Sequence, residues 1–248
     1  MNVLFPSEID VSILEYSDMR PFGDHAKVIY VSHKQEPVII QTPLMKCPYG
    51  LGRFDDGEKT KYSLDLSLGG DNKSVNSLKT LLESIDDKVL NDSTTNSLAW
   101  FKKKNQSRDV SQALFSSSVK VATENGEPTD KYPPTFKIKV PSYKDEFNKV
   151  LCYDDSKQSI ESDLRNLIPK GQNVRCIVRL AGVWFAGGKF GLTWDLLQVK
   201  LTPRAQIKEY AFQDESEDED EDNVENEDNG DSSPVGEQNY VLDSEDEL

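Results

Sequence analysis

The sequence contains few of the residues that build disulfide frameworks and metal sites. Its three cysteines, Cys47, Cys152 and Cys176, are far apart and form no CxxC pair. Such a set is typical of a reducing compartment and argues against a disulfide framework and a zinc site. The two histidines, His25 and His33, have no company at the spacing of metal ligands. We therefore expect no metal and no cofactor.

Catalytic signatures are also missing. The sequence has no Walker loop, no HExxH and no Ser/His/Asp signature. The glycines of YGLGRF, residues 49–54, do not form the GxGxxG pattern that opens a helix after a strand in a dinucleotide site. Asp65 and Asp195 are the only acids that we expect within strands, which is too few for a metal nuclease. We expect that the protein is not an enzyme.

Long apolar runs are absent as well. No stretch approaches the roughly 20 apolar residues that a membrane-spanning helix needs. The first residues, MNVLFPSEID, lack the pattern of a secretory signal. We expect an intracellular protein without a membrane segment.

Basic residues are missing from one end of the chain. Residues 214–248 contain 17 Asp and Glu and no Lys or Arg. Since the whole chain has 44 acids and 29 bases, residues 1–213 have 27 acids against 29 bases, a net charge of +2. The acidic runs repel one another and have few apolar residues to bury, so we expect a disordered tail over residues 206–248. A tail that only confers solubility is the alternative.

The strongest structural signal is VRCIVRLAGVWFAGGKFGLTWDLLQVKL, residues 174–201. Two runs of β-forming residues flank Gly187-Gly188-Lys189, which predicts a hairpin. A two-residue loop would place Asp195 on the face of Leu180 and Trp184. A three-residue loop gives an apolar register, so we predict that loop, with both Trp184 and Trp194 buried and Trp194 opposite Gly182. The doubled Leu196-Leu197 predicts a bulge.

The opposite face of this hairpin is basic. It carries Arg175, Arg179 and Phe185, with Lys189 at the loop tip. Two arginines, an exposed aromatic ring and a basic tip suit a surface that holds a phosphodiester backbone and stacks a base. A half-solvated strand whose arginines keep it soluble is the alternative.

Further elements precede the hairpin. Strands are expected over residues 26–32, 37–42 and 61–68, and a helix begins after Asp71 or Asn72. A short helix over 96–101 ends in three lysines and is expected to bury Trp100 and Phe101, although contact with nucleic acid is the alternative. Residues 105–133 look like a loop-rich insertion, apart from a short strand near Ser118 to Ala122. A hairpin of 135–140 with 147–153 and a helix over 159–168 follow.

This order of elements is that of an OB-fold, a five-stranded Greek-key barrel with a helix between its third and fourth strands. We expect a mainly β protein with N-terminal strands and loops over 1–60, an OB-fold over 61–205 with an insertion at about 70–133, and the tail. Another small barrel or a sandwich remains an alternative. The candidate DNA-binding residues are Arg53, Lys61, Lys137, Lys139, Arg175, Arg179, Phe185 and Lys189, and the candidates for base stacking are Trp184, Phe190 and Trp194.

The segment from Arg179 to Trp194, the strand KYSLDLSL at 61–68 and the acidic end carry a resemblance. The chain resembles a group of proteins of large nucleo-cytoplasmic DNA viruses that is similar to the phage-type replicative single-stranded-DNA-binding proteins. The resemblance covers residues 60–201 and is sharpest over 173–201. It implies single-stranded DNA binding in replication, recombination and repair, a homodimer, and a location at the viral replication site in the nucleus or cytoplasm, or in the virion.

The resemblance also implies that the tail competes with DNA and recruits replication enzymes. The tail departs from the phage pattern, in which the last residue is aromatic, because its last residue is Leu248 and Tyr240 lies eight residues earlier. The candidate partner-binding residues are Asp214, Glu217, Asp218, Glu219, Asp220, Glu221, Asp222, Tyr240 and Leu248.

Two other functions fit parts of the sequence. An acidic-tailed chaperone of basic, histone-like proteins would use the tail as its main surface. A virion- or transcription-associated scaffold would use the fold and leave the basic strand face idle. Retention on single-stranded DNA after removal of the tail separates single-strand binding from both.

Overall fold

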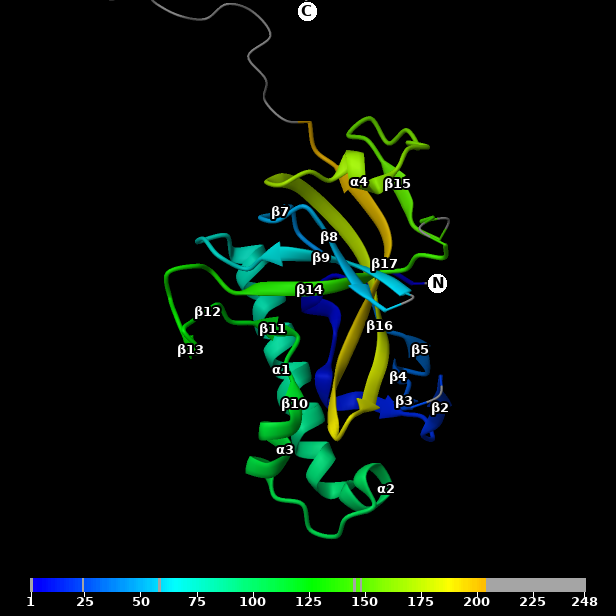
Figure 1. The fold of residues 1–248 in the computed structure, drawn as a ribbon, viewed down its shortest axis with the longest axis vertical. Helices are drawn as coiled ribbons and strands as arrows, with labels where there is room; N and C mark the ends of the chain where they lie inside the picture. The colour runs from blue at the N-terminus through cyan, green and yellow to red at the C-terminus, as the bar shows by residue number, and fades with distance from the viewer. Residues whose placement is uncertain (1, 24, 58, 145, 148, 204–248) are drawn as a thin grey trace, which may run out of the picture. The chain divides into compact units, whose positions relative to one another are not determined.

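Five strands of the structure curl into a barrel in the strand order of an OB-fold (Figure 1). The computed structural model describes residues 2–23, 25–57, 59–144, 146–147 and 149–203. The acidic tail, with all its candidate partner-binding residues and its expected disorder, lies outside the described residues. The first barrel strand consists of two segments, β7 (Met45–Cys47) and β8 (Leu51–Asp56). The other four are β9 (Lys59–Ser67), β14 (Thr135–Val140), β16 (Gln172–Ala186) and β17 (Lys189–Leu201).

The pairings of these strands define the fold. β8 pairs with β9, β9 with β14, and β16 with β17, all antiparallel. β14 meets β17 in parallel at Lys139 and Asp195, and β7 closes the circuit on β16. With 45–56 as the first strand, the order around the barrel is first, second, third, fifth, fourth and first again. The predicted mainly β OB-fold is therefore confirmed.

The predicted order made 61–68 the first barrel strand and 135–140 the second, but they belong to the second and third strands. Residues 61–68 lie in the second strand, and the first is supplied by 45–56, which break at Gly50. Gly50 has a φ of +72°, and a Cβ there would lie 2.8 Å from the carbonyl oxygen of Ile168, so only glycine fits. The glycines and charges of this stretch hide the alternation that identifies a strand.

The hairpin predicted from 135–140 and 147–153 does not form. β15 (Leu151–Tyr153) pairs instead in parallel with residues 198–200 of β17. β17 is much longer than β14, so its C-terminal end has a free edge that β15 fills. α4 (Leu164–Leu167) follows and is shorter than the helix predicted over 159–168.

The turn of the β16–β17 hairpin also differs from the prediction. Ala186 pairs with Lys189, so the loop has two residues, Gly187 and Gly188, with φ of 57° and 78°. Two positive φ angles are those of a type I′ turn. A register shift between Leu180 and Gly182 then moves Trp194 opposite Leu180, on the buried face. The three-residue loop was wrong, but the bulge leaves Trp194 buried as predicted, with 2% of its surface exposed.

A second irregularity confirms a prediction. The register of β16 and β17 shifts again between Ile177 and Val178, where Leu197 has no partner in the ladder. This is the bulge expected from the doubled leucines. Beyond it, Val199 points into the core and is buried.

N-terminal strands extend the barrel. β3 and β6 pair with the outer edge of β16, and β1, β4 and β5 form a separate small sheet. The strands expected over 26–32 and 37–42 are present but shorter and interrupted. The bounds are β1 (Leu14–Tyr16), β2 (Arg20–Phe22), β3 (Ala26–Ile29), β4 (Val31–His33), β5 (Glu36–Pro37) and β6 (Ile39–Gln41).

The helical insertion between β9 and β14 is confirmed. Asn72 caps α1 (Lys73–Thr95) by accepting hydrogen bonds from the amides of Ser74 and Val75. The apolar residues of one side of this helix are buried: Val75, Leu78, Leu81, Leu82 and Ile85. The rest of the insertion is α2 (Ser97–Phe101), α3 (Arg108–Leu114), β10 (Phe115–Ser116), β11 (Val119–Lys120), β12 (Thr123–Glu124) and β13 (Glu127–Pro128).

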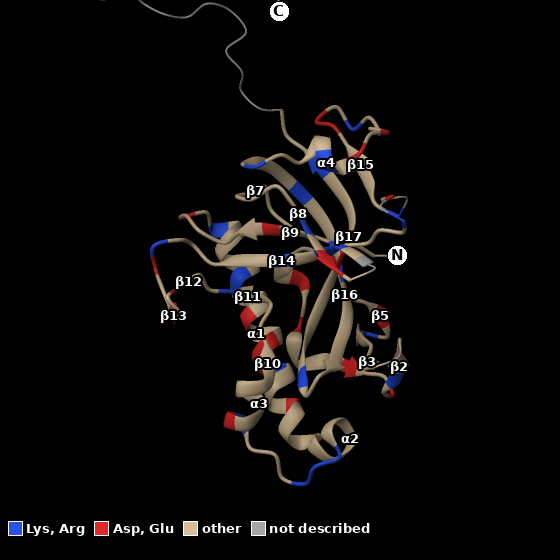
Figure 2. Ribbon diagram, in the orientation of Figure 1, with Lys and Arg blue, Asp and Glu red and all other residues tan. Residues whose placement is uncertain are grey.

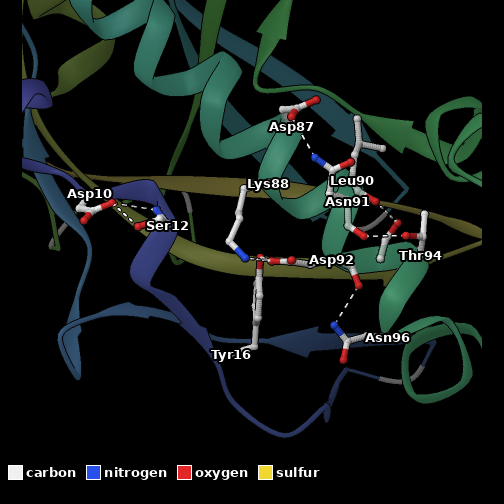
Figure 3. Close-up of polar contacts among 11 residues, drawn as sticks. Asp10, Ser12, Tyr16, Asp87, Lys88, Leu90, Asn91, Asp92, Thr94 and Asn96 are labelled. Atoms are coloured by element: carbon white, nitrogen blue, oxygen red, sulfur yellow. Dashed lines mark hydrogen bonds and ion pairs between the residues drawn. The ribbon is translucent and has the colours of Figure 1, made fainter.

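Polar contacts join α1 to the N-terminal segment (Figure 3). The hydroxyl of Tyr16 donates to the carboxylate of Asp92 at 2.6 Å, and Lys88 forms an ion pair with the same carboxylate at 2.6 Å. Burial and Asp92 raise the pKa of Tyr16, so this hydroxyl remains a donor. Nearby, the Tyr16 ring meets the edge of Trp100 at 5.3 Å. The insertion is thus fixed to the barrel and its N-terminal strands.

The core is continuous from the barrel into α1. All three cysteines are buried within it as free thiols. Within the described residues, no helix is both long and apolar enough to cross a membrane. The same residues contain no cluster of three or more His, Cys, Asp or Glu that could hold a metal ion.

Candidate nucleic-acid interface

A basic pocket is hollowed into the outer face of the barrel, where β14 and β17 diverge. It has a volume of about 340 Å³. Its floor and walls come from β8, β9, β14 and β17 and from residues 116–120 of the insertion. Four lysines line it: Lys61, Lys120, Lys137 and Lys139.

Strand alternation explains why the lysines face outward. In β14, Ile138 is buried and pairs with Leu64, while Lys137 and Lys139 are exposed. Lys139 lies opposite Ser63 on β9 and opposite Asp195 on β17. The hydrophobic residues of these strands therefore fill the barrel, and the basic residues remain on the surface that an OB-fold uses for ligands.

The basic pocket is electropositive. No Asp or Glu side chain is among the described residues that line it. No described carboxylate lies within ion-pair distance of Lys120, Lys137 or Lys139. Beside it, burial raises the pKa of Asp65, and the charges of Lys137 and Lys120 act in the opposite direction. Figure 2 shows lysines and arginines in blue along the barrel strands.

An aromatic pocket adjoins the basic pocket. It has a volume of about 550 Å³ and shares Lys139 and Thr193 with its neighbour, so the two lie side by side, and together they are called the groove. Phe22, Tyr30 and Trp184 line it. Phe22 and Tyr30 are 55% and 47% exposed, so both residues are accessible to a ligand.

Arg179 and Asp195 line the aromatic pocket. Nη2 of Arg179 lies 3.1 Å from Oδ2 of Asp195, directly across the β16–β17 ladder. Arg179 Nε and Asp195 Oδ1 are buried and have no hydrogen-bond partner among the described residues. The arginine therefore retains a donor for a ligand, because this ion pair does not use all of its N–H groups.

The structure brings together six of the residues predicted from sequence. The residues that line the groove are Lys61, Lys137, Lys139, Arg179, Trp184 and Trp194. These residues lie close together because the strands that carry them, β9, β14, β17 and β16, are successive neighbours in the sheet.

Three of the predicted basic residues lie outside the groove. Arg175 lines separate hollows with Gln41. Arg53 is exposed on β8 and forms an ion pair with Asp55. Lys189 is exposed at the hairpin turn and does not line either pocket. Their roles in DNA binding stay predictions.

The expected exposure of Phe185 was wrong. Its ring stacks on Phe190 with centroids 5.8 Å apart and meets the edges of Trp100 and Phe101, each at 5.7 Å. α2 covers this face of the hairpin, so Phe185 is half-buried. α2 also buries Trp100, as the sequence predicted.

Two of the three candidates for base stacking have no open ring face. Phe190 is fully buried at 0% exposure. Trp194 packs against Phe136 at 5.5 Å and donates its indole hydrogen to Ser118. Trp184 is the exception, because it is only partly buried and lines the aromatic pocket, contrary to the register that predicted its burial.

Sequence reasoning missed four residues of the groove. Phe54 is 65% exposed at the edge of the basic pocket, and Lys120 lines the same pocket. Phe22 comes from an N-terminal segment in which no strand was predicted, and Tyr30 lies in the strand predicted over 26–32, where its ring was not recognised as a ligand contact. An exposed aromatic residue beside a basic one, as in Arg53-Phe54, is the signal that would have found Phe54.

The model of a protein family of unknown function, DUF5871, matches residues 67–214, which is more than half of the chain. The chain belongs to this family. The match covers the insertion, the last three barrel strands and the groove lysines except Lys61. A comparison with curated proteins found no match.

Among solved structures, the chain is similar to two phage proteins. A single-stranded DNA-binding protein from bacteriophage Enc34, solved in complex with single-stranded DNA, is 13% identical; the match covers 76% of this chain and 96% of that one, with a TM-score of 0.44. For gp2.5, a single-stranded DNA-binding protein encoded by bacteriophage T7, the identity is 12%, the coverage 70% and 91%, and the TM-score 0.42. The fold assignment therefore rests on the strand order of this chain.

Proposed function

We propose that the protein binds single-stranded DNA, without sequence preference, in the groove formed by the basic and aromatic pockets. The observation that carries the proposal is the shared wall of Lys139 and Thr193, which joins four lysines to three aromatic side chains on one barrel face. Lysines neutralise backbone phosphates, and aromatic rings stack on the face that every base has. The two interactions occur side by side here.

The aromatic rings favour single strands over duplex. Bases of a single strand are free to leave their neighbours and stack on Phe22, Tyr30 or Phe54, each of which has an open ring. In a duplex the same bases are stacked and paired, so only the backbone contacts remain. Trp184 adds a further ring beside Arg179.

The wider role also belongs to the proposal. We infer that single-strand binding serves viral DNA replication, recombination and repair at the replication site of an infected cell, that the protein acts as a homodimer, and that the acidic tail competes with DNA and recruits replication enzymes. The charge of residues 214–248, which is opposite to that of the groove, supports the competition. The resemblance of residues 173–201 to viral and phage proteins supports the rest.

A titration tests the proposal. The full chain is titrated with fluorescent oligothymidylates of several lengths, and with a duplex of the same length, over a series of salt concentrations. We expect tighter binding to the single strand and a log-log salt slope of roughly −0.7 per phosphate neutralised, or roughly −2 to −3.5 for three to five contacts. Equal affinity for duplex, or a slope of zero, would contradict the proposal.

A second arm addresses the chaperone alternative. A chain that ends at residue 213 keeps the groove and loses the acidic tail. Retention of this chain on single-stranded DNA is expected, whereas a chaperone that works through its tail would lose its ligand.

A further inference from the structure

Residues 116–120 form a wall of the groove that comes from the insertion and not from the barrel. Ser116 lies in β10, which pairs in parallel with residues 190–191 of β17. Lys120 lies in β11, which pairs with residues 135–136 of β14. The segment therefore bridges the gap that opens where β14 and β17 diverge.

A buried carboxylate of α1 holds this wall. Asp86 accepts three hydrogen bonds: from the Ser117 hydroxyl at 2.6 Å, the Ser118 amide at 2.7 Å and the Ser118 hydroxyl at 2.9 Å. The Ser118 hydroxyl in turn accepts from Nε1 of Trp194 at 3.2 Å. One side chain of the helix thus fixes the backbone and two side chains of the wall, and links them to β17.

Lys120 extends from this wall into the basic pocket. Its Nζ donates to the Ser116 hydroxyl at 2.7 Å, and its side chain is half-buried. Burial lowers the pKa of Lys120; the charges of Asp86 and Asp65 act against this, and that of Lys137 acts with it. Asp86 is committed to the serines, so the ammonium group has no carboxylate at ion-pair distance among the described residues.

We propose that Lys120 and the Ser116 hydroxyl bind a backbone phosphate of the single strand, and that Asp86 is the positioning residue that holds them at the groove. This inference rests on the proposed function. A half-buried ammonium group without an ion pair gains more from a phosphate than a fully hydrated lysine does, because less water screens the interaction. The insertion is then part of the DNA site.

The first test replaces the charge. Lys120→Gln should lower the affinity for an oligothymidylate several-fold at moderate salt and make the log-log salt slope shallower by about 0.7, the loss of one phosphate contact. Lys79→Gln removes the same charge from α1, at a lysine that does not line the basic pocket, and should leave the slope unchanged.

The second test separates positioning from charge. Asp86→Asn removes a negative charge near the groove, so general electrostatics alone would tighten DNA binding. Displacement of the wall predicts weaker binding with the shallower slope of Lys120→Gln. If Asp86→Asn does not fold, Ser117→Ala removes the hydrogen bond that this hydroxyl donates to Asp86 and the one that it accepts from the Val119 amide, and should change affinity in the same direction.

The outcomes are distinguishable. If the unaltered chain fails to bind single-stranded DNA, the proposed function is overturned, and this inference with it. If the unaltered chain binds and Lys120→Gln keeps its slope, only the role of Lys120 is overturned. If both Asp86→Asn and Ser117→Ala fold and bind more tightly, or as well as the unaltered chain, Asp86 does not position the site.

Discussion

The indole nitrogen of Trp194 donates a hydrogen bond to the hydroxyl of Ser118 across 3.2 Å, which joins the last barrel strand to the insertion. The two residues are 76 positions apart in the chain. The same hydroxyl donates to Asp86, so Trp194 is indirectly connected to α1. Trp194 is therefore a structural residue of the groove.

This position predicts a stability effect. Trp194→Ala should lower the free energy of unfolding by about 3–5 kcal/mol, because the buried indole leaves a cavity. Trp194→Phe keeps most of the packing and loses the hydrogen bond to Ser118, so its cost should be smaller, about 1–3 kcal/mol. Urea denaturation of both variants measures the difference. A Trp194→Ala chain of unaltered stability that fails to bind DNA would instead make the indole a ligand contact.

Open aromatic rings should affect binding and not stability. Phe54→Ala and Tyr30→Ala should each cost about 1–3 kcal/mol of single-strand binding, the usual value of a stacked base. Their unfolding free energies should change by no more than about 0.5 kcal/mol, as is usual for surface substitutions. Tyr132→Ala is the matched control, since this ring is also exposed but lies outside both pockets. Equal losses for Tyr132→Ala would show that the groove rings have no special role.

The sequence was sufficient for the fold and for part of the groove. The alternation in 135–140 and 174–201 predicts outward Lys137, Lys139 and Arg179, and the structure brings all three to one groove. The predictions that were wrong depend on contacts between residues far apart in the chain. Phe185 reads as exposed in its own strand, and the helix that covers it lies more than 80 residues earlier in the chain.

Local irregularity hid the remaining features. The three-residue loop was predicted because, in a regular hairpin, it keeps Asp195 off the buried face. A bulge between Leu180 and Gly182 instead buries Trp194 with a two-residue loop, and no sequence pattern predicts that bulge. Gly182 has a φ of +142°, and a Cβ there would lie 2.4 Å from the Ile29 carbonyl oxygen, so the irregularity depends on contact with β3. Lys120 lies in the short strand predicted near Ser118 to Ala122, but the sequence does not reveal that this strand pairs with β14 beside the groove lysines, so Lys120 was missed.

The buried thiols should be inert in the folded protein. Burial raises the pKa of Cys47 to about 12 and that of Cys152 to about 11, and it raises the pKa of Cys176 well above its usual value. Since the thiolate is the reactive form, a disulfide reagent at pH 8 should react very slowly with the native chain. Addition of denaturant should release all three thiols. Rapid reaction of any one under native conditions would reveal local opening around it.

Asp86 should contribute to the pH dependence of stability. Burial raises its pKa, while the hydrogen bonds from Ser117 and Ser118 and the charge of Lys120 lower it. The folded chain then binds this proton more tightly than the unfolded chain does. The protonated carboxyl group therefore contributes its full stabilisation of the fold below the unfolded pKa of about 3.9, and this stabilisation is lost as pH rises through the pKa of the folded state. The free energy of unfolding of the unaltered chain, minus that of the Asp86→Asn chain, should therefore decrease from about pH 4 upward. A difference that increases with pH would mean that the hydrogen bonds outweigh burial.

The tail should inhibit the groove in a salt-dependent manner. Removing residues 214–248 changes the net charge from −15 to +2 and leaves every described groove residue in place. The composition of the tail predicts a flexible segment, which keeps a high local concentration of negative charge near the groove lysines. The shortened chain should bind single-stranded DNA more tightly at low salt, and the gain should shrink as salt screens the charges.

A scrambled tail of the same composition is the control for this prediction. Because the competition depends on charge and not on order, the scrambled chain should bind DNA as the unaltered chain does. Recruitment of replication enzymes would require the natural order, so it should be lost in the scrambled chain and in the shortened one. Equal affinity of the shortened and unaltered chains at low salt would reduce the tail to a solubility device. A lower affinity of the shortened chain would instead make the tail part of the binding surface.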